Sequence, residues 1–281
     1  MLSHDKNAVN DHYAHGSLWA VICKALVDMG KELHRLNVDD LSPVDAFHIR
    51  GRSATVELAA RSQIGPDFEV LDVGCGIGGA VRYLSSAYAC KTTGIDLTEE
   101  YIEVARRLAH AVGLDELVSF HCASALNMPF ADASFDIVWT EHVQMNIEDK
   151  GAFYKEMARV LKPGGRLVFH DVFSGEGGEP YYPVPWAETA RISYLSTINE
   201  LKGYLQDTGF SIQYWEEKSQ ESLNWFRVAV RRMKSSGTAP LGVHLLMGPT
   251  ARKKIENLIS NLSEQRITVL QAMMQKSGGR A

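Results

Sequence analysis

The sequence lacks the features typical of secreted, zinc-binding or membrane-spanning proteins. It holds only four cysteines in 281 residues, with no Cys-x-x-Cys pair and no Cys/His spacing typical of a zinc site. No apolar run approaches the about 18 residues of a membrane-spanning helix, and Met1-Leu-Ser-His-Asp-Lys-Asn7 has no apolar segment typical of a signal peptide. We therefore expect a cytoplasmic protein with reduced, buried thiols, no metal site and no membrane partner.

Basic charge is also scarce, because 29 Lys and Arg face 34 Asp and Glu and leave a formal net charge of −5. Nucleic-acid binding requires an electropositive face, so we expect no nucleic-acid partner. The basic cluster of Arg227, Arg231, Arg232 and Lys234 is more typical of a solvent-exposed helix face. The hydrophobic fraction of 45% and the length favour one globular domain with additions, covering residues 1–281.

Short β-rich runs alternate with helical segments through the middle of the chain. This alternation is typical of βαβ units, in which helices cover both faces of a parallel sheet. The fold class expected is therefore α/β and doubly wound. The strands expected are 68–73, 91–96, 118–122, 135–140 and 166–173, with helices following Gly78 and at 98–112 and 150–161.

The two ends of the chain add further segments to this core. Apolar spacing predicts a helix over 17–36, a turn at Leu41-Ser-Pro-Val-Asp45 and a helix from Thr55 to Arg61. Residues 161–165, Leu-Lys-Pro-Gly-Gly, should turn the chain after a helix. The irregular segment 174–186 is interpreted as a lid-like loop. Beyond it we expect helices at 197–208, 222–234 and 250–262 and strands at 209–217 and 266–275. The chain thus divides into an N-terminal cap (1–52), a cofactor-binding core (53–173) and a substrate-side half with lid insertions (174–281).

A glycine-rich turn, Asp72-Val-Gly-Cys-Gly-Ile-Gly-Gly79, follows the first strand of the core. Such a turn lets backbone N–H groups approach a ligand at the carboxyl edge of a parallel sheet. Asp96, about 20 residues on, ends the next strand and is suited to bind both ribose hydroxyls. Dehydrogenases carry a related motif and acidic residue, so these features alone indicate a nucleotide-like cofactor.

Later motifs distinguish the possibilities. The glycine turn, Asp96-Leu97, Met128-Pro-Phe130, Ser134-Phe-Asp-Ile-Val138 and Leu161-Lys-Pro-Gly-Gly-Arg166 together resemble, in order and spacing, the motif set of class I S-adenosylmethionine-dependent methyltransferases. The resemblance implies a Rossmann-like, seven-stranded, mostly parallel sheet whose last strand is antiparallel. It also implies S-adenosylmethionine as cofactor and S-adenosylhomocysteine as product. The cofactor-binding residues expected are Phe47, His48, Gly74, Cys75, Gly76, Gly78, Asp96, Leu97, Ser124, Ala125 and Glu141.

A looser resemblance concerns Phe47-His-Ile-Arg-Gly51, Thr140-Glu-His-Val-Gln-Met-Asn146 and Ile147-Glu-Asp-Lys150. These segments look like the N-methyltransferases that act on sarcosine, dimethylglycine and phosphoethanolamine. The likeness implies that Phe47 and His48 fold over the methionine part of the cofactor and that Glu141 and His142 line the reaction centre.

The chain departs from its relatives at two positions. After the third strand, Ala123-Ser-Ala125 replaces the acidic residue that often meets the adenine amino group, although Ser124 can accept one hydrogen bond. In the phosphoethanolamine enzymes a histidine pairs with an N-terminal tyrosine as a latch. Here Asn146 stands at the histidine position, and Tyr13 is the candidate tyrosine.

His142 is the candidate general base for an amine acceptor, because histidine titrates near neutrality. The alternative is that it only hydrogen-bonds substrate or backbone. The pair His170-Asp171 could contact the acceptor or satisfy nearby backbone groups. Aromatic side chains of the lid could attract a methylated ammonium or anchor the loop. The catalytic residues expected are His142, Tyr13 and Asn146, and the substrate side is expected to include Met145, His170, Tyr181 and Trp186.

The sequence favours methyl transfer to a small-molecule acceptor, with an amine such as a glycine derivative ahead of O- or C-methylation. Two alternatives stay open at this point. A nicotinamide-dependent oxidoreductase would share the glycine turn, and a cofactor-binding regulatory protein would keep the fold without catalysis.

Overall fold

A seven-stranded sheet forms the centre of the computed structural model, which describes residues 12, 17–237 and 239–278. The strand order is β3-β2-β1-β4-β5-β7-β6, and β7 runs antiparallel to both β5 and β6. The other pairs are parallel, as expected for a doubly wound α/β fold. The strands are β1 Glu69–Val73, β2 Lys91–Asp96, β3 Val118–Cys122, β4 Phe135–Glu141, β5 Leu161–Ser174, β6 Phe210–Glu217 and β7 Ile267–Lys276.

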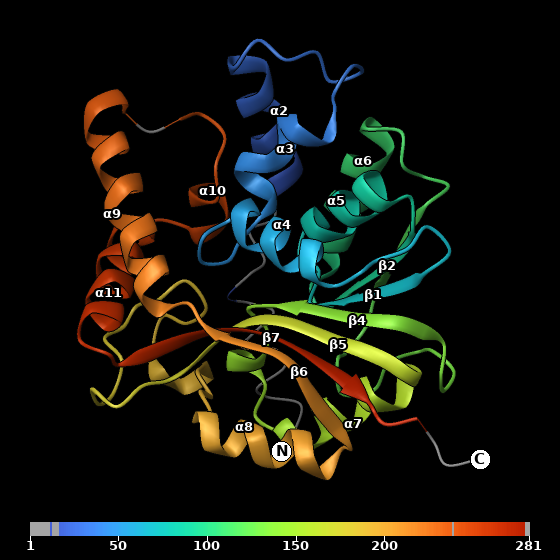
Figure 1. The fold of residues 1–281 in the computed structure, drawn as a ribbon. Coiled ribbons are helices and arrows are strands. Elements are labelled where there is room, and N and C mark those ends of the chain that lie inside the picture. The colour runs from blue at the N-terminus through green and yellow to red at the C-terminus, as the bar shows by residue number, and fades with distance from the viewer. Residues whose placement is uncertain (1–11, 13–16, 238, 279–281) are drawn as a thin grey trace.

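Helices cover both faces of the sheet (Figure 1). The helices α4, α5 and α6 lie on one face and α7 and α8 on the other, while α9 and α11 flank the end near β7. The described helices are α2 Leu18–Asp28, α3 Val38–Asp45, α4 Arg52–Arg61, α5 Gly79–Tyr88, α6 Glu99–Ala111, α7 Lys150–Val160, α8 Ile198–Asp207, α9 Ser219–Ser236, α10 His244–Met247 and α11 Ala251–Ser263, with the 3-10 turns η1 Gln144–Asn146 and η2 Ala190–Ile192.

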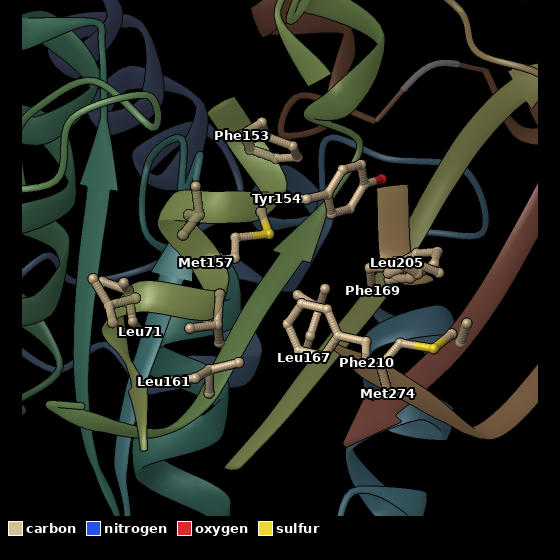
Figure 2. Close-up of a cluster of buried hydrophobic side chains, with 14 of the residues drawn as sticks. Leu71, Phe153, Tyr154, Met157, Leu161, Leu167, Phe169, Leu205, Phe210 and Met274 are labelled. Atoms are coloured by element: carbon tan, nitrogen blue, oxygen red, sulfur yellow. The ribbon is translucent and has the colours of Figure 1, made fainter. Parts of the chain in front are cut away.

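The largest core cluster lies between the sheet and the helices α7 and α8 (Figure 2). Phe153 and Met157 of α7 meet Leu167 and Phe169 of β5, and each of these side chains is almost completely buried. Such burial stabilises the fold, since truncating a buried Phe to Ala typically costs about 3–5 kcal/mol. The cluster fixes β4 and β5, whose carboxyl ends carry the functional side chains described below.

The helix α3 is held tightly against α5. The backbone oxygen of Asp45, at the end of α3, lies so close to Gly79 that a Cβ at residue 79 would overlap it. The Asp45 carboxylate also pairs with the guanidinium groups of Arg82 and Arg52, and the Arg82 pair is completely buried. The α3 helix is thereby fixed beside the start of α5, close to the glycine turn.

The structure confirms the predicted α/β fold and corrects several local expectations. Residues 41–45 form the end of α3 rather than a turn, because Asn37 and Asp40 make a capping box and Leu41 and Val44 are buried. The first helix ends at Asp28 instead of residue 36. Residues 161–165 belong to β5 rather than to a turn, although Gly164 does adopt a positive φ of 77°.

The cysteine expectation is only half right. All four are free thiols, and Cys75 and Cys90 are buried. Cys122 is exposed and Cys23 is partly exposed, so the prediction of burial is wrong for these two. The side chains of Arg227, Arg231, Arg232 and Lys234 lie exposed on α9, as predicted.

No helix among the described residues is long and apolar enough to cross a membrane. Within the same residues, no group of three or more His, Cys, Asp or Glu side chains could hold a metal ion.

Candidate cofactor and acceptor site

A cavity of about 220 Å³ lies at the carboxyl ends of β1, β2, β3 and β4. The loops that follow these strands supply most of its lining, as expected for a doubly wound sheet. Residues distant in the sequence complete it, among them Phe47 from the N-terminal cap, Trp186 and Tyr194 from the segment after β5, and Leu246 from α10. One part of the cavity therefore consists of the loops after the strands, and the other part is built from segments that are far apart in the sequence.

The glycine turn between β1 and α5 adopts a conformation that favours glycine. Gly74, Gly76 and Gly78 have φ values of 75°, 54° and 81°. A Cβ at residue 74 would overlap a methyl group of Val143, in the loop after β4. Gly78 does not line the cavity; a Cβ there would crowd the ring of Phe120, so its role is packing.

Asp96 receives two backbone hydrogen bonds at the end of β2. Its Oδ2 accepts from the N–H of Gly76 and its Oδ1 from the N–H of Thr98, each at 2.9 Å. Each carboxylate oxygen keeps acceptor capacity for a ribose hydroxyl. Asp96 thus ties the glycine turn to the start of α6 and places its carboxylate on the cavity wall.

The cavity wall is acidic. Burial raises the pKa of Asp96, and burial, followed by the charges of Glu141 and Asp96, raises the pKa of Asp72 well above its usual range. Three carboxyl groups that repel one another favour a ligand with positive charge. The sulfonium and ammonium groups of S-adenosylmethionine have the complementary sign.

The loop after β3 forms an apolar slot beside Asp96. Ala123, Ser124, Ala125 and Leu126 all line the cavity. Ser124 Oγ accepts a hydrogen bond of 3.3 Å from the N–H of Leu126 and keeps a further lone pair. The resemblance to the methyltransferases places the adenine ring beside this loop, with Ser124 in place of the acidic residue of relatives.

His48 comes from the N-terminal cap and meets Glu141 at the end of β4. Glu141 accepts a hydrogen bond of 3.0 Å from Thr55 Oγ1, and His48 Nε2 lies 3.4 Å from Glu141 Oε2. The side chain of Thr55 is buried in α4. The structure thus brings His48, expected over the methionine part of the cofactor, into contact with Glu141, expected at the reaction centre.

His142 follows Glu141 and has a positive φ of 56°. Its Nε2 accepts a 3.4 Å hydrogen bond from the N–H of Ile49, while the carbonyl of Ile49 accepts a 2.9 Å bond from His170 Nε2. A neutral His142 whose Nε2 is an acceptor carries its proton on Nδ1. Burial, followed by the neighbouring His170 and His48, lowers the pKa of His142 well below its usual range. The imidazole on the cavity wall is therefore neutral and offers an N–H.

Asn146 and Trp186 connect the loop after β4 to the lid-like segment. The amide nitrogen of Asn146 donates to the carbonyls of Trp186 at 2.9 Å and Ile192 at 2.8 Å. Trp186 Nε1 donates to Ser193 Oγ at 2.9 Å. Met145, Asn146 and Trp186 all line the cavity.

Two more predicted residues, besides Gly78, do not line the cavity. His170 is completely buried and is not part of the lining. Tyr181 lies on the surface, where its hydroxyl donates to Glu264 at 2.9 Å and its ring faces Arg266. Tyr13 is outside the described residues. Apart from Gly78, the other predicted residues all line the cavity.

Two residues important to this geometry were not singled out from the sequence as binding residues. Asp171 accepts hydrogen bonds from the N–H groups of Val143, Gln144 and Val172, which is the backbone role left open for it. Lys150 is buried at the start of α7 and donates to main-chain carbonyls. A charged residue at the start of a helix gives no sequence signal for such a role.

Known proteins resemble the chain over both the core and the whole fold. A family described as "Methyltransferase domain" matches residues 71–169. The sarcosine/dimethylglycine N-methyltransferase of Halorhodospira halochloris is 30% identical over 200 residues, covering 70% of each chain. Methyltransferase GfsG of Streptomyces halstedii is 36% identical over 133 residues, and this match spans 47% of this chain but only 48% of that protein.

A solved structure, geranyl diphosphate C-methyltransferase from Streptomyces coelicolor, superimposes with a TM-score of 0.71 at 18% identity, covering 98% of both chains. That likeness shows the fold alone. The names of other relatives include O-methyltransferases, so N-, O- and C-methylation all occur among similar proteins. On these matches the chain belongs to the class I S-adenosylmethionine-dependent methyltransferases.

Proposed function

We propose that the protein methylates the nitrogen of a small, largely apolar amine that carries no carboxylate, and that the amine reacts as its free base. The observation that carries this proposal is the state of His142. Its Nε2 accepts a hydrogen bond from the N–H of Ile49, so the proton of the neutral ring is on Nδ1, and His142 lines the cavity. His142 is then a hydrogen-bond donor and not the general base expected from the sequence.

Because His142 Nε2 is already hydrogen-bonded to Ile49, its imidazole is not free to act as a base, and this favours some acceptors over others. A neutral amine attacks with its lone pair and keeps its protons until after transfer, whereas an alcohol must lose its proton as it reacts. Two acidic side chains of the lining after β4 are already engaged and are not free to take a proton from an alcohol. Glu141 is engaged by Thr55, and Asp149 Oδ1 accepts the N–H of Ala152 as a helix cap.

The charges of the cavity wall also favour some amines over others. Among the described residues that line the cavity, none is Lys or Arg, so a carboxylate of the acceptor would have no cationic partner there. A glycine derivative would therefore be bound less well than an amine without a carboxylate. Met145, Trp186 and Tyr194 offer apolar and aromatic surface that suits a methylated ammonium product.

The chemistry demanded of the protein is mainly alignment. Bound S-adenosylmethionine supplies a methyl group already activated by the sulfonium. The amine lone pair forms the new C–N bond, the S–CH₃ bond breaks with its electron pair remaining on sulfur, and the ammonium product later loses a proton to water. The cavity residues hold the two reactants in line and exclude water.

A radiolabelled methyl-transfer assay with matched acceptors tests the proposal. The panel contains 2-phenylethylamine, its alcohol 2-phenylethanol, its carboxylated form phenylalanine, and sarcosine and dimethylglycine. We expect transfer to 2-phenylethylamine in preference to the alcohol and to each carboxylated amine. Transfer to the alcohol alone would contradict amine methylation, and transfer to sarcosine and dimethylglycine alone would contradict the charge argument.

A further inference from the structure

We propose that Lys150 is a positioning residue for the acceptor: with Asp171, it holds the cavity wall made by residues 143–147 and Tyr194 in its binding geometry. This inference rests on the proposed function only in naming this wall as the acceptor side. The wall itself is described by contacts within the chain. The backbone of this wall belongs to neither a long helix nor the sheet, so side chains must hold it in place.

The ammonium of Lys150 joins two segments that are more than 40 residues apart. Its Nζ donates to the carbonyl of Gln144 at 2.6 Å, to that of Tyr194 at 2.6 Å, and to that of Ile147. Three donors are all that an ammonium has. The same two segments also meet through the N–H of Tyr194, which donates to the carbonyl of Met145 at 2.7 Å.

Asp171 binds the same loop through groups of the opposite polarity. Its Oδ2 accepts from the N–H groups of Val143 at 3.2 Å and Gln144 at 3.1 Å, and its Oδ1 accepts from that of Val172 at 2.8 Å. The carboxylate therefore fixes the N–H groups at the start of the loop, and the ammonium fixes its carbonyls. Met145, Asn146 and Ile147, which line the cavity, lie between these two attachments.

Both charges are held at a cost to the fold. Lys150 is 5% exposed and Asp171 is 1% exposed, and no ion pair within 4.0 Å joins Lys150 to a described carboxylate. Burial lowers the pKa of Lys150 to about 8 and raises that of Asp171 to about 6. Burying charge without a contacting counter-charge is unfavourable, so a role in shaping the cavity explains its presence better than global stability does.

The geometry makes the wall dependent on pH. Asp171 on β5 and Glu200 on α8 face Lys150, and Lys150 in turn faces Asp171, as does Tyr154 of α7. All three N–H donors of Lys150 exist only while it is charged, and Asp171 accepts best while ionised. Both conditions hold between about pH 6 and about pH 8. Outside that interval the wall loses attachments.

Hydrogen exchange of the full-length protein saturated with S-adenosylhomocysteine tests the inference without knowledge of the acceptor. The variant is Lys150→Met, which keeps an unbranched chain but removes the ammonium. The matched control is Lys218→Met, which removes another buried lysine, bonded to Glu57, Glu216 and Glu221 away from the cavity. Lys150→Arg tests rescue by a cation that stays charged at every pH used.

In Lys150→Met we expect exchange in residues 143–147 and 190–195 to accelerate about tenfold or more, because local opening no longer breaks three charged hydrogen bonds. Lys218→Met should leave these segments within about threefold of the unmodified protein. The dissociation constant of S-adenosylhomocysteine should change little in either variant. For the amine of the panel with the highest turnover, Lys150→Met should raise KM much more than it lowers kcat.

The pH arm uses the unmodified protein and Lys150→Arg. After correction for intrinsic exchange, the same segments should open more readily above about pH 8 in the unmodified protein. Lys150→Arg should suppress that rise. Equal acceleration in the two Met variants, or a wall that is insensitive to pH from 6.5 to 9.5, would overturn the inference. If none of the amines in the panel is methylated, the hydrogen-exchange result still stands. The proposed function and the role of Lys150 can therefore be judged separately.

Discussion

The two ends of the cavity are built in different ways. At the cofactor end, neighbouring loops use their own backbone groups, as when Asp96 accepts the N–H of Gly76. At the acceptor end, side chains such as Lys150 and Asn146 tie together backbone carbonyls from distant segments. The first kind of site is local and depends on conformation, and the second depends on long-range contacts with buried polar groups. Changes at one end should therefore leave most of the other intact.

The largest effect is expected at the cofactor end from Asp96→Ala. The dissociation constant of S-adenosylhomocysteine should rise about 100-fold, because hydrogen bonds to a charged group contribute about 1.5–3 kcal/mol each. Isothermal titration calorimetry measures this change. Asp115→Ala is the control, since Asp115 lies on the surface beside His110. If Asp96→Ala binds S-adenosylhomocysteine with a dissociation constant within a few-fold of that of the unmodified protein, Asp96 does not hold the ribose.

The substitution Gly74→Ala should disturb both ends of the cavity at once. A Cβ at residue 74 would overlap the side chain of Val143, so the glycine turn and the loop after β4 would both shift. Overpacking and a positive φ together should lower the free energy of unfolding by about 2–3 kcal/mol. Urea denaturation measures it.

The double variant Gly74→Ala/Val143→Ala provides the matching control. Removing the Val143 methyl groups should recover part of the lost stability but not the backbone strain. Additive effects of the two substitutions would mean that the contact does not couple the two loops.

The cofactor end of the cavity could be predicted from the sequence better than the acceptor end. The strands, the glycine turn and Asp96 were predicted because each depends on a local pattern of burial or backbone conformation. The role of Lys150 was not, because its partners are main-chain carbonyls, which every residue possesses. Tyr181 was placed on the substrate side for its aromatic ring, yet it contacts Glu264 and Arg266, far along the chain. The α3 helix was missed although Asn37 and Asp40 carry its capping signal.

A rise in pH above about 8 should have opposite effects on two properties at the acceptor end. Loss of the Lys150 proton loosens the cavity wall, but it raises the free energy of unfolding of the whole protein. The folded pKa of Lys150, about 8, lies below its usual 10.5, so the folded protein releases this proton before the unfolded chain does. Its contribution therefore raises the free energy of unfolding between about pH 8 and pH 10.5. Asp171 has a raised pKa of about 6, so its contribution is fully present below its usual 3.8 and is lost as the pH rises through 6.

Urea unfolding at pH 7.5 and 9.5 measures the lysine effect. The difference in stability between the unmodified protein and Lys150→Met should shift in favour of the unmodified protein by on the order of 1–2 kcal/mol. The pH series for Lys218→Met corrects for the rest of the molecule. A difference that stays constant across this range would mean that Lys150 keeps its usual pKa.

The smallest effect is expected from exchanges at His142, which sharpen its role as a donor. An Asn amide nitrogen can replace Nδ1–H and also suits the positive φ of this position. A Gln amide reaches the Nε2 position instead. We expect His142→Gln to raise the KM of the best amine about tenfold and His142→Asn to raise it less.

A pH series on the unmodified protein complements these variants. Since the pKa of His142 lies well below its usual range, no loss of kcat/KM from its protonation should occur between pH 7 and pH 6. A fall across that interval which disappears in His142→Asn would restore the role of general base.

The position of β7 in the sheet has a consequence for how the protein is made. This strand follows all the others in the sequence, yet it lies between β5 and β6 and is hydrogen-bonded to both. During synthesis, β5 must wait with an open edge, and β6 has no neighbour until β7 leaves the ribosome. The glycine turn and Asp96 can fold early from contiguous chain, but the strand that carries Asp171 gains its second partner only once β7 has been made. Cofactor recognition can thus emerge during translation before the acceptor side is complete.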